Sequence, residues 1–223
     1  MTREQLDDYG FASHQKAIAA TKSGAFTAEI LPIEITLPDG TKEMHLVDEG
    51  IRFEGTREGM AAVKLLDENG VLTAATSSQI CDGAAGVMIV NERGLKALGV
   101  EPMARIVHMT VTGGDPVVML EEPLFGTEKA LKRSGMKIED IDLYEVNEAF
   151  APVPLAWLQH LGADPAKINV NGGAIALGHP LGGSGAKLMT TLVYALKAQN
   201  KRYGLQTMCE GGGLTNVTII ERL

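Results

Sequence analysis

The feature that most constrains the fold is a regular alternation of apolar, strand-like segments with helical segments after Pro102. The pattern predicts strands at residues 105–111, 142–145, 205–209 and 217–221, and helices at residues 125–134, 151–161 and 186–198. Strands that alternate with helices are typical of a layered α/β domain whose sheet is covered by helices. The second half of the chain is therefore expected to form one such domain, with Pro102 at its boundary.

The residues before Pro102 predict a more varied set of elements. A helix is expected over residues 2–22, where Thr2 and Gln5 form a capping box. Residues 28–47 alternate like strands around a turn at residues 38–40. A short helix is expected at residues 60–66, a buried strand in the apolar run of residues 84–90, and a second short helix ending at Leu98.

Composition and charge exclude several classes of protein. The chain has 223 residues, of which 45% are hydrophobic and 22% charged, the profile of an ordinary globular protein. The net charge of −8 argues against nucleic acid or an anionic membrane as the main partner. Two cysteines are too few for a disulfide scaffold and indicate a reducing compartment. Since the first residues lack the apolar core of a signal peptide, and no apolar run is long enough to span a membrane, we expect a cytoplasmic protein.

The 26 glycines are unevenly placed, because they crowd into residues 172–185 and 211–213 behind strand-like runs. Glycine placed this way lets the backbone turn tightly and approach a ligand closely. These two segments therefore predict a binding or catalytic site.

Asn147 and Glu148 directly follow the apolar strand expected before them. Polar side chains at the end of a strand lie where α/β folds place their ligands. The alternative is purely structural, with Asn147 capping the next helix and Glu148 in its first turn.

His179 lies within the glycine-rich segment and is followed by Pro180. A histidine held by backbone geometry and left accessible suits a general base or an oxyanion donor near neutral pH. One alternative is a phosphate-binding loop at the helix near Ala186, although the Walker pattern is absent. The other is a tight turn with an incidental histidine.

Cys209 ends a predicted strand and is followed by Glu210 and three glycines. Free backbone N–H groups beside a thiol can hold a developing oxyanion, and the thiol can move a proton or attack. The alternative is a small core residue. No metal is expected, because the two cysteines and five histidines lack zinc-ligand spacing.

Taken in order, three segments resemble the thiolase family: Asn-Glu-Ala-Phe at 147–150, Gly-Gly-Ala-Ile-Ala-Leu-Gly-His-Pro at 172–180, and Cys-Glu-Gly-Gly-Gly at 209–213. Residues 73–85 resemble another thiolase signature, which they depart from at Ala75 and Thr76 and at Cys81, where asparagine is more usual. Ser13-His14-Gln15, and Phe26 before Glu29-Ile30, are also similar to thiolases. The resemblance spans the chain and implies a thiolase-like layered α/β fold.

The resemblance also implies an acyltransferase activity. Thiolases cleave 3-ketoacyl-CoA with coenzyme A, or run the reverse Claisen condensation, through a nucleophilic cysteine and a second, acid–base cysteine. By motif, Cys209 is the acid–base cysteine, and His179 activates the nucleophile and donates to the thioester oxygen. Asn147 holds a water that completes this oxyanion site, and the Gly211 N–H contributes to the other. Coenzyme A and acyl-CoA are expected as substrates, with no cofactor.

The coenzyme A site is carried over from the same resemblance, and for each residue surface charge or core packing is the alternative. The expected residues are Arg52 near the nucleotide phosphates, Ala74 and Ser78 along the pantetheine channel, Leu66 and Met119 as apolar walls, and Phe150.

The chain departs from the family in length, since a thiolase is about twice as long and carries its nucleophile in the first half. Neither Cys81 nor Cys209 lies in the nucleophile motif. We therefore expect an incomplete thiolase fold without its N-terminal half. Its expected parts are a partial loop domain at residues 1–78, an orphan strand and helix of the N-terminal domain at residues 79–101, and the C-terminal domain at residues 102–223.

Three interpretations follow. The chain is a fragment of a 3-ketoacyl-CoA thiolase that is a homo-oligomer in full-length form, or one subunit of a split thiolase whose partner is a nucleophile-bearing N-terminal half. The third is a non-catalytic coenzyme A-binding or interaction module. The presence of Asn147, His179 and Cys209 together disfavours this third interpretation. The resemblance around Cys209 and Glu210 favours the degradative side, although the chain by itself is expected to be inactive.

Overall fold

The computed structural model describes residues 1–223, and a four-stranded mixed sheet forms its centre. The strand order is β3-β6-β5-β4, in which β4 and β5 are parallel and the other pairs antiparallel. The strands are β3 (Ala104–Gly113), β4 (Leu143–Val146), β5 (Tyr203–Glu210) and β6 (Leu214–Arg222). All four predicted strands are present; β3, β5 and β6 are longer than predicted, and β4 is shifted by one residue.

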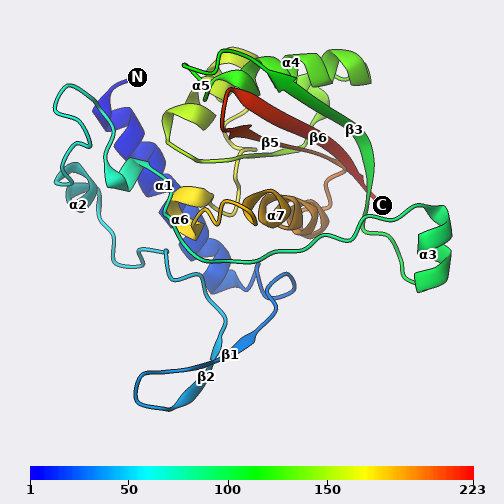
Figure 1. The fold of residues 1–223 in the computed structure, drawn as a ribbon, viewed down its shortest axis with the longest axis horizontal. Helices are drawn as coiled ribbons and strands as arrows, with labels where there is room; N and C mark the ends of the chain where they lie inside the picture. The colour runs from blue at the N-terminus through cyan, green and yellow to red at the C-terminus, as the bar shows by residue number, and fades with distance from the viewer.

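Helices cover both faces of this sheet, as Figure 1 shows. One face packs on α4 (Glu122–Ser134) and α5 (Pro152–Leu161), and the other on α7 (Ser184–Ala198). Successive strand residues serve opposite faces: Tyr144 packs in the core beneath α4 and α5, whereas Leu143 packs against α7. The predicted layered α/β arrangement is confirmed.

The N-terminal helix α1 (Arg3–Ser23) lies beside the glycine-rich segment. Its capping box of Thr2 and Gln5 is formed as predicted, and Gly24 ends the helix in the left-handed conformation. Ala17 and Ile18 of α1 pack on the short, unpredicted helix α6 (Ala174–Leu177). A segment far away in sequence therefore supports the loop that carries His179.

Two smaller elements project from this body. The strands β1 (Ile33–Thr36) and β2 (Lys42–His45) form the predicted hairpin, which extends away from the sheet in Figure 1. Helix α2 (Arg57–Ala61) begins three residues earlier than predicted, because the Thr56 side chain caps the Gly59 N–H. The structure also contains two 3₁₀ helices, Ala74–Thr76 and Ile138–Asp140.

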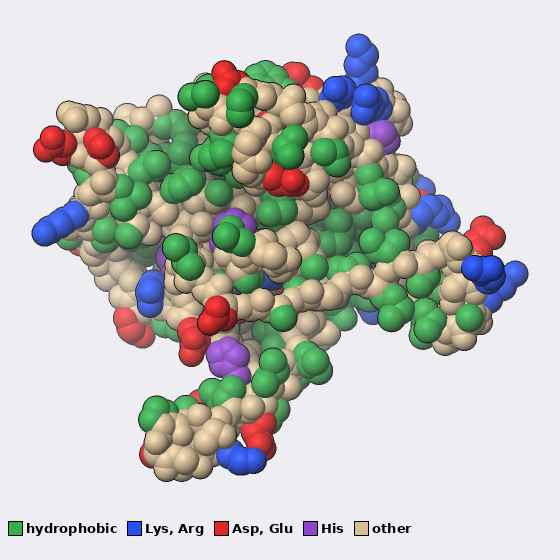
Figure 2. All heavy atoms as spheres, viewed as in Figure 1, with side chains coloured by type: hydrophobic (Ala, Val, Ile, Leu, Met, Phe, Trp, Pro, Cys, Tyr) green, Lys and Arg blue, Asp and Glu red, His purple; other side chains and the backbone are tan.

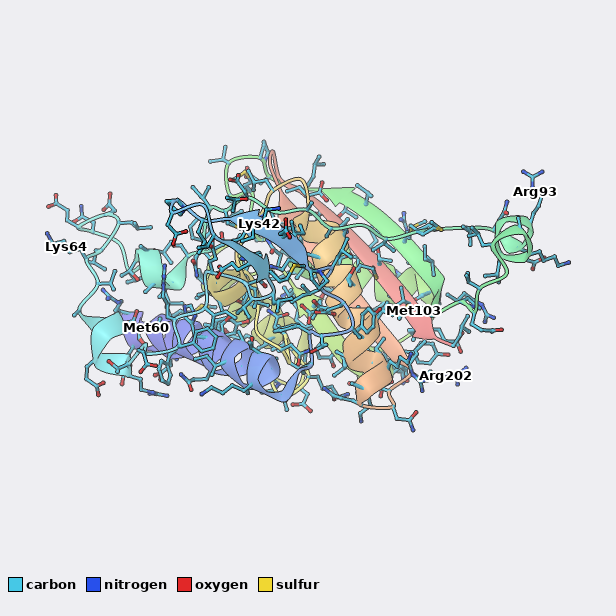
Figure 3. All side chains as sticks on the ribbon, turned by 90° about the horizontal axis from the view of Figure 1, so that it is seen from below. Lys42, Met60, Lys64, Arg93, Met103 and Arg202 are labelled. Atoms are coloured by element: carbon cyan, nitrogen blue, oxygen red, sulfur yellow. The ribbon has the colours of Figure 1, made fainter.

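The predicted buried strand at residues 84–90 is wrong. This segment pairs with no strand and is exposed throughout, with Met88 76% and Ile89 71% exposed. Figure 2 shows hydrophobic side chains along this extended segment, which leads to α3 (Glu92–Leu98). In Figure 3, Arg93 marks α3 at one end of the molecule and Lys64 marks the loop after α2 at the other. A strand needs a neighbour for its backbone groups and a cover for its apolar faces, and here it has neither.

None of the helices combines the length and the hydropathy that crossing a bilayer requires.

Candidate active site

Asn147 follows β4 and lies almost fully buried, with 1% of its surface exposed. Its Nδ2 is 3.3 Å from Nε2 of His179, so residues 32 positions apart in the sequence meet at one point. The alternative role of helix cap is wrong, because α5 begins at Pro152 and its capping position is Ala151. The side chain is therefore free to serve the site.

A second hydrogen bond fixes the ring of His179. Its Nδ1 lies 2.5 Å from the Ser184 hydroxyl, which itself lies 2.9 Å from the carbonyl oxygen of Pro180. A hydroxyl has one proton, and the carbonyl can only accept it. The Ser184 oxygen must therefore accept from Nδ1–H, which leaves the lone pair on Nε2 to receive the Asn147 N–H.

The electrostatics favour the same neutral imidazole. Burial lowers the pKa of His179 below its usual value, because the desolvated ring resists a positive charge. A neutral ring with its lone pair on an oriented Nε2 is the form that accepts a proton as a general base.

Glu148 anchors the glycine-rich loop that carries His179. Its buried carboxylate accepts hydrogen bonds from Tyr9 and Ser13 on α1, at 3.0 and 2.7 Å. It also accepts from Asn169 Nδ2 at 3.0 Å and from the Ile175 N–H at 3.1 Å. The carboxylate thereby ties α1 to β4 and α6. The sequence points to Glu148 by its motif and its place after a strand, and to Ser13 only by its likeness to thiolases, whereas no pattern points to Tyr9.

Two glycines let the loop approach these partners. Gly172 has a φ of +85°, and a Cβ there would lie 2.8 Å from the Ser13 carbonyl oxygen. A Cβ on Gly173 would lie 2.2 Å from the Glu148 carboxyl carbon. The glycines predicted to permit close approach do so toward other parts of the protein.

Residues 77–79 lie between the first two motifs and join them. Ser77 bridges to Phe150, and the Ser78 N–H donates to the Ala149 carbonyl at 2.9 Å. The His179 N–H in turn donates to the Gln79 carbonyl at 2.9 Å. Just beyond, the sulfur of Cys81 packs on Gly178. The structure therefore brings Ser78 and Phe150 to the Asn147–His179 pair.

Cys209 lies near the end of β5, opposite Thr215 of β6, and is only 7% exposed. Burial, with a smaller effect of the Glu210 charge, raises the pKa of its thiol to about 11. The side chain is therefore a protonated thiol at neutral pH. Gly211, which follows in the turn between β5 and β6, is exposed.

The other residues expected at the coenzyme A site are more scattered. Arg52 is exposed, and its N–H donates to Nδ1 of His14 at 3.2 Å. Burial and then the Arg52 charge lower the pKa of His14 to about 4, so this histidine is neutral. Leu66 is 60% exposed in the loop after α2, Ala74 is exposed in its 3₁₀ helix, and Met119 lies before α4 with a φ of +62°.

Comparison with known protein families identifies the family to which the chain belongs. Residues 100–222 match the family model described as thiolase, C-terminal domain, and residues 1–93 match the model described as thiolase, N-terminal domain. The chain belongs to the thiolase family.

Individual thiolases agree with this assignment. The chain is 52% identical over 223 residues to the steroid 3-ketoacyl-CoA thiolase FadA6 of Mycobacterium tuberculosis, covering all of this chain and 53% of that protein. It is 45% identical over 228 residues to the 3-ketoacyl-CoA thiolase of Marinobacter nauticus, covering 58% of it. The chain spans about half the length of the curated relatives that it matches.

Solved thiolase structures have the same fold. Human mitochondrial 3-ketoacyl-CoA thiolase superposes with a TM-score of 0.93 at 39% identity, and Bacillus anthracis acetyl-CoA acetyltransferase with 0.95 at 37%. All of this chain aligns in both cases, to 56% and 57% of the respective structures. The fold inferred from the motifs, a partial thiolase fold, is confirmed.

Proposed function

We propose that this chain supplies the acid–base and oxyanion groups of a thiolase active site, which transfers acyl groups between thiols. The reaction is cleavage of 3-ketoacyl-CoA by coenzyme A, or the reverse Claisen condensation. The observation that carries the proposal is the orientation of His179, whose Nε2 faces the Asn147 amide while Ser184 holds Nδ1.

His179 acts first as the base. The neutral ring takes the proton of the nucleophilic thiol, which then attacks the 3-keto carbon of the substrate. The protonated Nε2 can then donate to the thioester oxygen. Together with a water on Asn147, it stabilises the negative charge that develops there.

Cys209 moves the second proton. When the bond between the α-carbon and the keto carbon breaks, the resulting enolate takes the Cys209 proton and leaves as acetyl-CoA, while the shortened acyl group stays on the nucleophile. The Cys209 thiolate then removes the proton of the incoming coenzyme A, whose sulfur attacks the acylated nucleophile. Because burial raises its pKa to about 11, Cys209 is a thiol at neutral pH, the form that can give a proton to a strongly basic enolate.

The nucleophile belongs to another segment in this proposal. Cys209 is buried and protonated, and Cys81 lies outside the nucleophile motif. We propose a nucleophile-bearing N-terminal half as the partner, with residues 1–78, 79–101 and 102–223 as the loop-domain part, the N-terminal-domain remnant and the C-terminal domain. The names of the Mycobacterium tuberculosis and Marinobacter nauticus relatives support 3-ketoacyl-CoA as the substrate class.

A complementation assay tests this function. The 223-residue chain is assayed for thiolysis of acetoacetyl-CoA alone and after refolding with the N-terminal half of the Mycobacterium tuberculosis relative. We expect background rates alone and turnover in the mixture. The matched control is the same N-terminal half with its nucleophilic cysteine replaced by alanine, which should give none.

Two outcomes would contradict the proposal. Turnover by the lone chain, with an acyl group on Cys81 or Cys209 in mass spectra, would place the nucleophile within these residues. Coenzyme A binding without turnover in a correctly assembled mixture would favour a binding module.

A further inference from the structure

A small cavity borders Asn147 and is lined by residues of β4, of the glycine-rich loop with α6, and of α7. It offers about 20 Å³ to the centre of a water molecule, which is room for one. Its lining includes Glu145, Asn147, Ser184, Lys187 and Thr191. The cavity is therefore lined by the same elements that hold the site.

Two buried oxygen atoms of this lining have no hydrogen-bond partner. They are Oε2 of Glu145 and Oδ1 of Asn147, on residues that are each 1% exposed. Burying a polar atom without a partner is unfavourable, so such atoms usually pair with an ordered water. Nδ2 of Asn147 already donates to His179 and can donate once more, so Oδ1 is the atom of this amide that lacks any partner.

The other polar side chains of the lining already have partners. Ser184 is shared between His179 and Pro180, Thr191 donates to Glu29 at 3.1 Å, and Lys187 donates to the Leu177 carbonyl at 2.6 Å and to Asp48 at 3.2 Å. Glu145 and Asn147 are therefore the pair left for an occupant.

We propose that one ordered water in this cavity joins Glu145 to Asn147, and that Glu145 is thereby a positioning residue for the Asn147–His179 pair. The water donates to Oδ1 of Asn147, so the amide keeps Nδ2 turned toward Nε2 of His179. It is distinct from the water expected at the oxyanion site, because it joins Asn147 to Glu145 and not to the substrate.

The charge state of Glu145 favours water over a cation as the occupant. Burial raises the pKa of this carboxyl well above its usual value, and the charges of Glu148 and Glu29 raise it further, while Lys16 opposes them. A neutral carboxyl both donates and accepts, which suits water, but it gives little attraction to a cation.

The consequence lies in the titration of His179. Without the carboxyl and its water, the Asn147 amide turns so that Oδ1 faces Nε2. An oxygen there stabilises the Nε2–H of the charged ring, so the pKa of His179 should rise. Ser184 continues to hold Nδ1 in either case.

The test is NMR titration of His179 in the whole 223-residue chain, with long-range ¹H–¹⁵N spectra for the tautomer. Glu145→Leu should raise the pKa of His179 by about half a unit or more, the scale of a neighbouring dipole. Glu145→Gln keeps a donor and an acceptor, and should preserve both the pKa and the tautomer. No turnover is needed, so this result is independent of whether the acyltransferase proposal, on which the role in catalysis rests, succeeds.

Three results would overturn the proposal. One is a folded Glu145→Leu variant with an unchanged His179 titration. Another is a Glu145→Gln variant that shifts as much as Glu145→Leu, which would mean that the negative charge acts directly. The third is a His179 titration that differs between potassium and sodium buffers, which would identify a cation in the cavity.

Should Glu145→Leu fail to fold, a high-resolution crystal structure of the wild-type chain decides. We expect a water oxygen about 3 Å from both Glu145 Oε2 and Asn147 Oδ1. An empty cavity, or a direct bond between the two side chains, would contradict the proposal.

Discussion

The Ser184 hydroxyl accepts a hydrogen bond from Nδ1 of His179 while it donates to the carbonyl of Pro180, and so determines which ring nitrogen carries the proton. Ser184→Ala removes this anchor. We expect the Nε2–H tautomer to appear in ¹⁵N spectra. The free energy of unfolding should fall by about 1 kcal/mol, since the hydrogen bonds of the Ser184 hydroxyl are lost.

A matched control for Ser184 lies on the same helix. Thr190 donates to the Ala186 carbonyl four residues earlier, the same kind of bond that Ser184 makes to Pro180, but it does not touch His179. Thr190→Ala should leave the His179 tautomer unchanged. A similar tautomer shift in both variants would mean that helix stability, and not the hydroxyl, orients the ring.

Gly173 and Glu148 make the second prediction. The backbone of Gly173 is extended, with a φ of −142°, so alanine is acceptable to the chain itself. Its methyl group would meet the Glu148 carboxylate. Gly173→Ala should lower the free energy of unfolding in urea by about 2–3 kcal/mol, the upper range for overpacking.

Gly182 is the control for that substitution, because a Cβ there meets nothing within 4 Å. Gly182→Ala should change the free energy of unfolding by about 0.5 kcal/mol or less. Equal effects at the two positions would show that contact with the Glu148 carboxylate does not restrict the side chain at position 173.

The apolar segment before α3 gives a third prediction. Met88 and Ile89 are exposed in an unpaired, extended stretch, and such surface promotes association. We expect self-association by sedimentation at tens of micromolar, within the aggregation range. Replacing both by lysine should reduce it, whereas Leu31→Lys, at an 83% exposed site elsewhere, should reduce it less. A stable wild-type monomer would refute this.

Glu29 links stability to pH. Burial raises its pKa from 4.5 to about 7, although the Thr191 hydrogen bond and the Lys187 charge oppose the shift. The folded state therefore holds this proton more tightly than the unfolded state does. The stabilisation is complete below pH 4.5 and is lost as the pH rises through about 7.

Glu29→Gln isolates this effect. The wild-type free energy of unfolding, measured relative to the variant, should fall by on the order of 1–2 kcal/mol between pH 4.5 and 7.5, after allowance for the partial exposure of the group. Urea unfolding at a series of pH values measures it. A difference between the two proteins that stays constant over this range would mean that Glu29 does not titrate near neutrality.

Local patterns were sufficient for the elements whose stability is local or strongly periodic. The capping box at Thr2 and the apolar strands β5 and β6 are examples of such elements. The segment at residues 84–90 has the same apolar character as β5, but a strand depends on a neighbour that composition does not reveal. The structure places Asn147 beside His179, and its capping alternative fails because α5 starts five residues later.

The hydrogen bonds that Glu148 accepts from α1 could not be predicted from local sequence patterns. Its partners Tyr9 and Ser13 are 139 and 135 residues away. Ser13 lies in a thiolase-like triplet, but no pattern connects either residue with Glu148. Glu145 was likewise read only as part of a strand. Only the packing of β4 against α7 shows that Glu145 is buried near the carboxylates of Glu148 and Glu29.

The two cysteines should differ in reactivity, since thiolate is the reacting form. Cys209 is buried with a pKa of about 11, whereas Cys81 is exposed. Iodoacetamide at pH 8 should therefore label Cys81 first, and mass spectrometry of the partly labelled chain should find Cys209 protected by at least about tenfold, as its small thiolate fraction requires.

In the reconstituted enzyme, Cys209→Ser should lose at least about a hundredfold in turnover, the lower range for a lost general acid–base group. His179→Ala should lose as much or more, because it has two roles. Cys81→Ser is the matched control and should lose far less. Faster labelling of Cys209 than of Cys81 would mean that its thiol is activated, and would make Cys209 a candidate nucleophile in place of a proton carrier.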